Sequence, residues 1–529
     1  MAMRAEPLNL KFAVTNFGPL ASAEIDLRPL TIFVGPSNTG KSYMAILIYA
    51  FLRSWENLHY FESRRFDFGS LRDGEEDRFR EEAEKLQEIV ENMKRAVMVS
   101  DFPELSRSHL RKMIRDQEFL GGILDRELMR CFDIIPVGHL IRSSSDPQPM
   151  KIIASRSKQN KPFWDFSVSV RGQEFVCDGN ISDFSVFEAT DQERVNFLTR
   201  IPFTSPHKDS RQISAAYRLH RLASFFEGYL KETLLDFGDV HYLPAARSGM
   251  MQAHRVIASS LVARSVRAGF EQIQLPTLSG VIADFLQKII LYKEERRGIR
   301  WGARWGSPFR RAHKELARVA DSMENDILSG EIRADFSSTL DYPGFVYRPK
   351  GAAQDIGLAR TSSMIAELAP IILFLRGHVS RGDVLIIEEP ESHLHPAAQT
   401  KLAAVLAELI RNDVKVIITT HSEWLLQAIS NLMREGELRE GGDESEDVSS
   451  PVLRSEEVGA WLFRPGKGDS GSTVQELKFD PIAGISPPDY EEVDLALYNR
   501  SAKLQDQLQV PGHRIGSDYE GDIRGEEKP

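Results

Sequence analysis

The chain has 529 residues, 42% of them hydrophobic and 27% charged, which is ordinary globular usage and excludes collagen-like, disordered and disulfide-scaffold classes. The 66 basic and 77 acidic residues give a net charge of −11, which excludes an overall basic surface but not a local basic patch. Two cysteines, Cys131 and Cys177, fit a reducing cytosol. The N-terminus lacks a secretory h-region and no apolar stretch is long enough to cross a membrane. We therefore expect a cytoplasmic protein without a membrane partner.

The first 59 residues predict strands and a helix around a glycine-rich loop. Alternating patterns over 10–14 and 23–27 predict a strand pair, and the apolar run 30–34 predicts a short strand. Residues 43–52 are apolar on nearly every side, so we expect a helix buried against a sheet.

The next segment, 60–237, is predicted to be an insertion of helices and strands. Apolar residues at steps of three and four predict helices over 75–98 and 212–235. Between these helices, the pattern predicts short strands over 151–154, 164–170 and 174–177.

The C-terminal half returns to the core over 238–255, and a helical insertion follows over 256–340. In the second lobe, 341–433, β-branched runs at 384–387 and 414–419 end in charged or hydroxyl residues. Buried parallel strands show this pattern when their carboxyl ends carry a site. The remaining segments are predicted to be an acidic linker over 434–450, a hairpin and helix over 451–510, and a disordered tail over 511–529.

The strongest motif is a complete GxxxxGK[ST] loop that follows a predicted strand and opens a predicted helix, as this motif requires. The loop amides and the helix N-terminus form a nest for phosphates. Lys41 would contact the β- and γ-phosphates, and the Ser42 hydroxyl would bind Mg²⁺. The nucleotide-binding residues are thus predicted to be Gly35, Pro36, Ser37, Asn38, Thr39, Gly40, Lys41 and Ser42.

Two carboxylates follow the predicted strand 384–387, as a Walker B strand requires. Glu388 would hold the Mg²⁺ shell, and Glu389 would orient or deprotonate the attacking water. Because charged residues often end strands, the functional interpretation depends on the phosphate loop upstream. After the next strand, His421 is predicted to hydrogen-bond the γ-phosphate as a sensor. The alternative is that it caps a helix beginning near Glu423.

These motifs together resemble the ABC-type ATPases of the SMC and OLD kind, most closely the stand-alone OLD-like (AAA-15/21-type) ATPases. The motifs, in the order of the family, are NFGPL (16–20), the phosphate loop, LARTSSMIAEL (358–368), LIIEEPESHLHP (385–396) and TTHS (419–422). The resemblance implies an α/β fold: a P-loop ABC/SMC-like ATPase head with inserted helical and antiparallel β segments. It also implies an ATPase that uses ATP and Mg²⁺, dimerises around ATP, and has Lys41, Glu389 and His421 as catalytic residues.

The same resemblance assigns further residues. Ser362 and Ser363 match the signature that contacts the γ-phosphate held by the opposite subunit, although this chain has SSM in place of SGG. Residues 392–395 match the D-loop, and Glu388 replaces the usual Walker B aspartate. The segment 243–247 lies where a Q-loop is expected, with Gln252 as the candidate glutamine. Two further residues lie where the first strands of the family approach the base, Asn16 and Phe17.

OLD proteins usually carry a fused Toprim nuclease, but no acidic DxD strand end or Cys/His metal spacing follows residue 430. We therefore expect a sensor or regulator of a separately encoded nuclease or toxin in prokaryotic anti-phage or mobile-element defence. The alternative is a DNA-structural or DNA-repair ATPase. Long coiled-coil arms would favour this alternative, and no heptad pattern here exceeds about three to four turns. A transporter subunit is disfavoured by the long insertions between Lys41 and Glu388.

One basic segment stands apart from these motifs. Residues 296–311 hold six arginines and no acidic residue, interleaved with Trp301, Trp305 and Phe309. Arginine with aromatic residues suits phosphate contacts and base stacking, so DNA is a candidate partner. The alternative is a loop docked on an acidic surface of this protein or of a partner.

Overall fold

The computed structural model describes residues 9–65, 97–98, 115, 120–143, 148–158, 161–182, 185–187, 237–268, 278–292, 313–336, 342–440 and 451–509. The chain divides into two compact units, Met1–Ile485 and Ser486–Pro529. In the second unit the described residues form one helix, α13 (Pro488–Gln509), which confirms the helix predicted there. The predicted helix over 212–235, the basic segment 296–311, the tail 511–529 and most of the predicted helix 75–98 lie outside the described residues.

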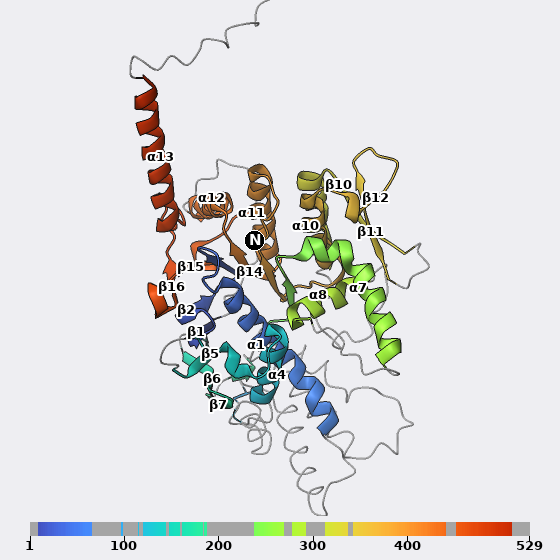
Figure 1. Ribbon diagram of the computed structural model, residues 1–529, viewed down its shortest axis with the longest axis vertical. Coiled ribbons are helices and arrows are strands. Elements are labelled where there is room, and N and C mark those ends of the chain that lie inside the picture. The colour runs from blue at the N-terminus through green and yellow to red at the C-terminus, as the bar shows by residue number, and fades with distance from the viewer. Residues whose placement is uncertain are drawn as a thin grey trace, which may run out of the picture. The chain divides into compact units, whose positions relative to one another are not determined.

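A sheet of eleven described strands, in the order β7-β6-β5-β1-β2-β16-β15-β3-β14-β13-β9, lies at the centre of the first unit (Figure 1). At one end, neighbouring strands run parallel: β15 (Val458–Arg464), β3 (Leu30–Val34), β14 (Lys415–Thr420), β13 (Val384–Glu388) and β9 (Val240–Leu243). Glu388 pairs in register with Thr419, and Thr420 with Val34. The carboxyl ends of β3, β14 and β13 therefore meet at one edge, where parallel sheets place their sites.

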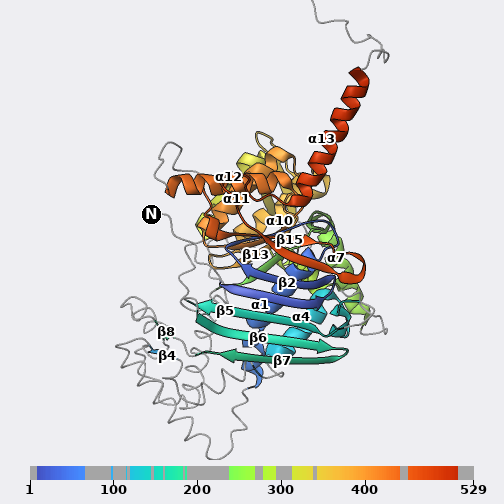
Figure 2. The same cartoon turned by 90° about the vertical axis from the view of Figure 1, so that its left-hand side faces the viewer.

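The other end of the sheet is largely antiparallel. Its strands are β1 (Leu10–Phe17), β2 (Leu20–Leu27), β5 (Met150–Lys158), β6 (Lys161–Arg171), β7 (Glu174–Ile181) and β16 (Ser472–Leu477). β16 pairs with β15 as the predicted hairpin. β5 pairs with β1, so the strands predicted inside the insertion extend the sheet of the N-terminal lobe (Figure 2).

Both faces of the parallel strands are covered. On one face α1 (Lys41–Arg65) and α4 (Gly122–Phe132) pack together, and Ile386 and Ile417 belong to their core. Successive side chains of a strand point to opposite faces, so Ile387 and Ile418, equally buried, point to the other face. There α11 (Pro396–Arg411) contacts β14 and α12 (Glu423–Glu440).

The remaining described elements follow β9 or connect these layers. The helices are α7 (Arg247–Ala268), α8 (Gly280–Ile290), α9 (His313–Met323), a π-helical turn (Glu324–Leu328) and α10 (Ser363–Gly377). The short helical turns are Val137–Leu140, Leu358–Arg360, Ser455–Glu457 and Gly468–Ser470. A small sheet contains β10 (Gly330–Asp335), β11 (Gly344–Pro349) and β12 (Ile356–Gly357).

Two predicted boundaries are wrong. The acidic linker was predicted from residue 434, but α12 continues to Glu440. Tertiary contacts hold these last turns: Arg434 donates to the carbonyls of Pro481 and Ile482 at 2.8 and 2.7 Å. The helix predicted to end at residue 98 instead has a strand there, β4 (Val97–Met98), because this segment pairs with β8 (Ser185–Phe187).

Candidate nucleotide-binding site

The phosphate loop lies between the carboxyl end of β3 and the start of α1. Its backbone needs the left-handed region at Gly35 (φ 134°), Asn38 (φ 62°) and Gly40 (φ 101°). A Cβ on Gly35 would come within 2.3 Å of the carbonyl oxygen of Phe463, so this glycine is also required by close packing against β15. The exposed residues at the tip of the loop are Pro36, Ser37 and Asn38.

Lys41 places its ammonium at the mouth of this loop. Its Nζ donates to the carbonyl oxygens of Gly35 and Pro36 at 2.8 and 2.7 Å. Burial lowers the pKa of Lys41 to about 8, although Glu389 and Glu391 oppose the shift. Ser42, the next residue, is exposed and lies in the first turn of α1 on the same edge of the sheet.

The two glutamates after β13 have different surroundings. Glu388 is buried, and its Oε2 accepts a hydrogen bond from the amide of Ala245 at 3.1 Å. Glu389 is half-buried, with its side chain 41% exposed; it adopts φ 42° and accepts a hydrogen bond from the Ser392 hydroxyl at 3.1 Å. The amide of Glu389 donates to the carbonyl oxygen of Thr419 at 2.9 Å, which ties it to the next strand. Glu388 is thus fixed inside the protein, whereas the carboxylate of Glu389 is accessible to water.

His421 follows β14 and lies beside Glu389, with 3.9 Å between its Nε2 and Oε1 of the glutamate. Burial and Lys41 lower the pKa of His421, and Glu389 opposes them. The helix α12 begins at Glu423, after Ser422, whose hydroxyl accepts a hydrogen bond from the amide of Leu425 at 3.0 Å. Ser422 therefore provides this cap, which removes the main argument for His421 as the capping residue.

Glu391 is a site residue that the sequence analysis missed. Its Oε1 accepts hydrogen bonds from the Thr420 hydroxyl at 2.6 Å and from the amide of His421 at 2.8 Å. The side chain is buried, and burial raises its pKa. Glu391 therefore fixes the segment that carries His421. The only signal in the sequence was a third acidic residue in the run EEPE.

The predicted signature and D-loop residues lie on other elements. Ser362 is the N-cap residue of α10 and Ser363 is its first residue, and both are exposed. In the D-loop, Ser392 contacts Glu389, and the Nδ1 of His395 accepts a hydrogen bond from the amide of Ala397 to cap α11. The D-loop thus joins Glu389 to the start of α11.

The segment expected to be a Q-loop contributes an arginine instead of a glutamine. Gln252 is exposed on α7. Arg247 is completely buried and forms hydrogen bonds with the carbonyl oxygens of Glu388 and Glu389 at 2.5 and 3.0 Å. The LPAAR segment therefore contacts both glutamates, through Ala245 and Arg247.

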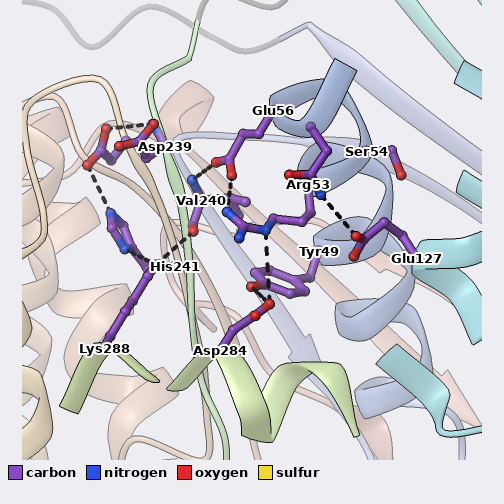
Figure 3. A network of polar contacts seen from close by, with 12 residues as sticks. Tyr49, Arg53, Ser54, Glu56, Glu127, Asp239, Val240, His241, Asp284 and Lys288 are labelled. Atoms are coloured by element: carbon purple, nitrogen blue, oxygen red, sulfur yellow. Dashed lines mark hydrogen bonds and ion pairs between the residues drawn. The ribbon is translucent and has the colours of Figure 1, made fainter. Parts of the chain in front are cut away.

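A buried polar network holds the middle of α1 (Figure 3). Tyr49 donates to Asp284 of α8 at 2.6 Å, and Glu56 accepts from the amide of Val240 at 2.5 Å. Val240 is the first residue of β9, so the network ties the phosphate-loop helix and α8 to the amino end of this strand.

At the same amino end, His241 lies between a carboxylate and an ammonium. Its Nε2 is 3.0 Å from Oδ2 of Asp383, and its Nδ1 is 2.6 Å from Nζ of Lys288 (Figure 3). Burial raises the pKa of Asp383 to about 7 and lowers the pKa of Lys288 to about 8. Because Asp383 directly precedes β13, these contacts fix the start of the strand whose other end carries Glu388.

Residues 292–426 match the family model described as AAA ATPase domain, a segment that includes Ser362, Ser363, Glu388, Glu389 and His421. No curated protein matches the chain.

Among the described residues, no helix has the length and apolar character needed to span a membrane.

Three solved SMC head domains are similar at low identity. The SMC head bound to the C-winged helix domain of ScpA is 10% identical, with a TM-score of 0.39 and coverage of 89% of this chain and 98% of that chain. The SMC head domain from Thermotoga maritima is 11% identical, with a TM-score of 0.34 and coverage of 90% and 100%. An SMC head with an extended coiled coil, bound to the C-terminal domain of ScpA derived from Pyrococcus furiosus, is 11% identical, with a TM-score of 0.36 and coverage of 93% and 98%.

The chain has an α/β fold with a phosphate loop between a buried strand and a helix, and two glutamates end a neighbouring parallel strand. Together with the match over residues 292–426, this arrangement supports an ATPase domain of the P-loop type.

Proposed function

We propose that the protein binds ATP with Mg²⁺, hydrolyses it, and dimerises around the nucleotide. The observation that carries this proposal is that Lys41, Glu389 and His421 come from three separate segments and lie close together at one edge of the sheet. The Nε2 of His421 and the Oε1 of Glu389 are 3.9 Å apart. The charge of Glu389 raises the pKa of Lys41, and the charge of Lys41 lowers the pKa of His421.

The site contains oxygen donors that fit Mg²⁺. The ion usually binds one or two carboxylates together with substrate phosphates, and Ser42 and Glu388 offer a hydroxyl and a carboxylate. A further buried carboxylate oxygen, Oε2 of Glu391, has no hydrogen-bond partner among the described residues, so these contacts leave one oxygen free to bind a metal ion. When bound, Mg²⁺ would neutralise charge on the β- and γ-phosphates.

The residues of the chain have distinct roles in the proposed reaction. Lys41 would exchange its loop carbonyls for phosphate oxygens. Glu389 would accept a proton from the water whose oxygen attacks the γ-phosphorus, and ADP would leave with the bridging oxygen. The Nε2 of His421, next to Glu389, would hydrogen-bond the γ-phosphate.

The exposed start of α10 supports the dimer. Ser362 and Ser363 lie at a helix N-terminus, where amides and the helix dipole favour an anion. In the proposed dimer these serines would contact the γ-phosphate bound by the other subunit.

A calorimetric titration with ATP and an assay of phosphate release test the proposal. Lys41→Ala should abolish both nucleotide binding and hydrolysis, because the ammonium and the loop amides act together on the phosphates. Lys467→Ala, which removes an exposed lysine between β15 and β16, should leave both unchanged. If Lys41→Ala binds ATP as tightly as the wild type, the assignment of the loop is wrong.

For the biological role, we propose a sensor or regulator of a separately encoded nuclease or toxin in prokaryotic defence against phages or mobile elements. This role is supported only by the family resemblance of the motifs.

The basic segment 296–311 favours the alternative of a DNA-binding ATPase. Replacing Arg300, Arg304 and Arg310 with glutamate should eliminate DNA binding in a gel-shift titration with salt varied. Unchanged binding would remove the DNA interpretation of this segment.

A further inference from the structure

Arg247 is a charged residue in an unusual place. It begins α7 four residues after β9 ends, and its side chain is 0% exposed. A buried charge is costly unless it is paired and hydrogen-bonded. The partners of this guanidinium therefore show which parts of the fold it holds together.

On one side, Arg247 binds the backbone that carries the two glutamates. Its Nη1 donates to the carbonyl oxygens of Glu388 at 2.5 Å and Pro244 at 3.2 Å. Its Nη2 donates to the carbonyl oxygen of Glu389 at 3.0 Å. Glu389 adopts a left-handed backbone conformation, which needs support from its surroundings in a residue other than glycine. Arg247 and Thr419 supply that support.

On the other side, Arg247 binds α10. Its Nη2 lies 2.7 Å from Oε1 of Glu367, and its Nε donates to the backbone carbonyl oxygen of Glu367 at 3.2 Å. Glu367 is itself 0% exposed, and burial raises its pKa while Arg247 opposes the shift. Glu367 lies about one helical turn after Ser363, in the part of α10 that precedes Pro370. The guanidinium of Arg247 is therefore a rigid bridge between α10 (Ser363–Gly377), called the signature helix below, and the backbone of Glu388 and Glu389.

We propose that Arg247 and Glu367 couple the signature helix to Glu389, so that hydrolysis becomes fast only when the start of α10 engages the nucleotide of the other subunit. This inference rests on the proposed nucleotide dimer and adds the route by which dimer closure controls chemistry. Arg247 and Glu367 act as positioning residues, because neither would touch the nucleotide.

The physical basis is the rigidity of the bridge. A planar guanidinium that donates in fixed directions to the carbonyl oxygens of Glu367 and Glu389, and that forms an ion pair with the carboxylate of Glu367, transmits a displacement of α10 to the peptide of Glu389. A misplacement of about 1 Å in a catalytic group lowers a rate by as much as about 100-fold. A small movement of Glu367 is therefore sufficient to switch Glu389 between effective and ineffective positions.

The first test is Glu367→Gln, which keeps the shape of the side chain and removes its charge. We expect kcat to fall about 10-fold to 100-fold while KM for ATP stays within about twofold of the wild type. The ATP-dependent dimer should still form, as measured by light scattering, because the phosphate loop and Ser362 and Ser363 are intact.

The matched control is Glu324→Gln. Glu324 is also buried and also forms an ion pair with α10, at 2.6 Å from Arg376. Arg376 lies in the last turn of α10, at the end away from Ser363. We expect both variants to lower the unfolding midpoint and only Glu367→Gln to lower kcat. If Glu324→Gln loses as much kcat, loosening of α10 explains the effect and the coupling proposal is overturned.

A second variant keeps the proposal testable if Glu367→Gln does not fold. Arg247→Met with Glu367→Leu replaces the ion pair by apolar groups of similar volume, a change that proteins often tolerate. It should show the same loss of kcat with nucleotide binding and dimer formation retained. Wild-type kcat in this double variant would overturn the proposal.

The concentration dependence of the specific activity separates a failure of the coupling proposal from a failure of the proposed nucleotide dimer. The specific activity of the wild type should rise with protein concentration as dimers form. If the wild type lacks this rise, the nucleotide dimer is wrong and the coupling proposal falls with it. If the wild type shows it and Glu367→Gln retains the same activity at saturation, only the coupling proposal is contradicted.

Discussion

The Nε2 of His421 lies 3.9 Å from the Oε1 of Glu389, although the two residues follow different strands. Burial and Lys41 lower the pKa of His421, which favours the neutral form of the imidazole. A neutral ring with one N–H can donate to a phosphate oxygen without attracting the carboxylate strongly. Glu391 holds the backbone amide of His421, so the position of the ring depends on a second carboxylate in the same loop.

We predict that Glu389→Gln retains ATP binding and loses hydrolysis. Glutamine keeps the shape and a hydrogen-bonding group but does not accept the proton of the attacking water. The rate of phosphate release should fall by about 10²-fold or more, the scale of a positioned acid–base group. Calorimetry should show an affinity for ATP close to that of the wild type.

The matched control for this variant is Glu24→Gln, which changes an exposed glutamate of β2. It should hydrolyse ATP at the wild-type rate. A Glu389→Gln protein with more than about a tenth of the wild-type rate would show that another group activates the water.

We predict that affinity for ATP decreases as the pH rises above 8. In the free protein the pKa of Lys41 is lowered to about 8, and bound phosphates raise it because they favour the ammonium. At pH 9 the protein must therefore take up a proton when ATP binds, and affinity should fall by up to about tenfold per pH unit. Calorimetry in buffers of different ionisation enthalpy should detect this uptake at pH 9 and little of it at pH 7.

Lys41→Arg provides the control for the pH dependence, because arginine stays charged over this range. Its affinity, even if weaker overall, should not change between pH 7 and pH 9. An equally steep decrease in Lys41→Arg would assign the titration to a different group.

We predict that Trp164→Ala destabilises the whole first unit. Trp164 of β6 is buried, and its ring centroid lies 5.6 Å from that of Trp55 and 6.2 Å from that of Phe51 on α1. The substitution should lower the free energy of unfolding by about 3–5 kcal/mol, measured by urea denaturation. Trp424→Ala, at a site that is 56% exposed, should cost much less. Equal losses would contradict the packing of β6 on the phosphate-loop helix.

The parts of the site that could be predicted from the sequence are those that local motifs encode. The segments 30–42 and 384–389 each contain a predicted strand followed directly by candidate site residues, so the carboxyl ends of these strands could be predicted to carry a site. The Arg247–Glu367 pair joins positions 120 residues apart; both lie in segments that the motifs covered, 243–247 and 358–368, but the motifs assigned neither residue a role. Such a contact depends on tertiary packing, which residue spacing does not record.

Tertiary contacts also explain the wrong boundary at residue 434. The run REGELRE reads as a solvated loop by composition. In the structure, Gly436 lies so close to the backbone of Leu453 that a Cβ would come within 2.1 Å of its carbonyl oxygen. Packing against the chain after the acidic segment therefore makes residues 434–440 helical.

We predict that Ser363→Arg binds ATP but does not form the nucleotide dimer. The phosphate loop is unchanged, whereas a bulky cation at the exposed start of α10 blocks the face that would meet the other subunit. In a Glu389→Gln background, uncleaved ATP should stabilise the closed dimer by mass action. Light scattering with ATP should therefore report a larger species for Glu389→Gln than for Glu389→Gln/Ser363→Arg. Equal sizes, with nucleotide bound to both, would contradict a signature that acts across the dimer.

Mixing two inactive variants tests the same arrangement by activity. In a heterodimer of Lys41→Ala with Ser363→Arg, one composite site contains both lesions and the other is intact. Because the intact site has a normal phosphate loop and a normal signature, the mixture should recover hydrolysis that neither variant shows alone. If the mixture stays inactive while light scattering detects the heterodimer, the two sites must act together. In that case the size comparison in the Glu389→Gln background decides whether the signature acts on the opposite nucleotide.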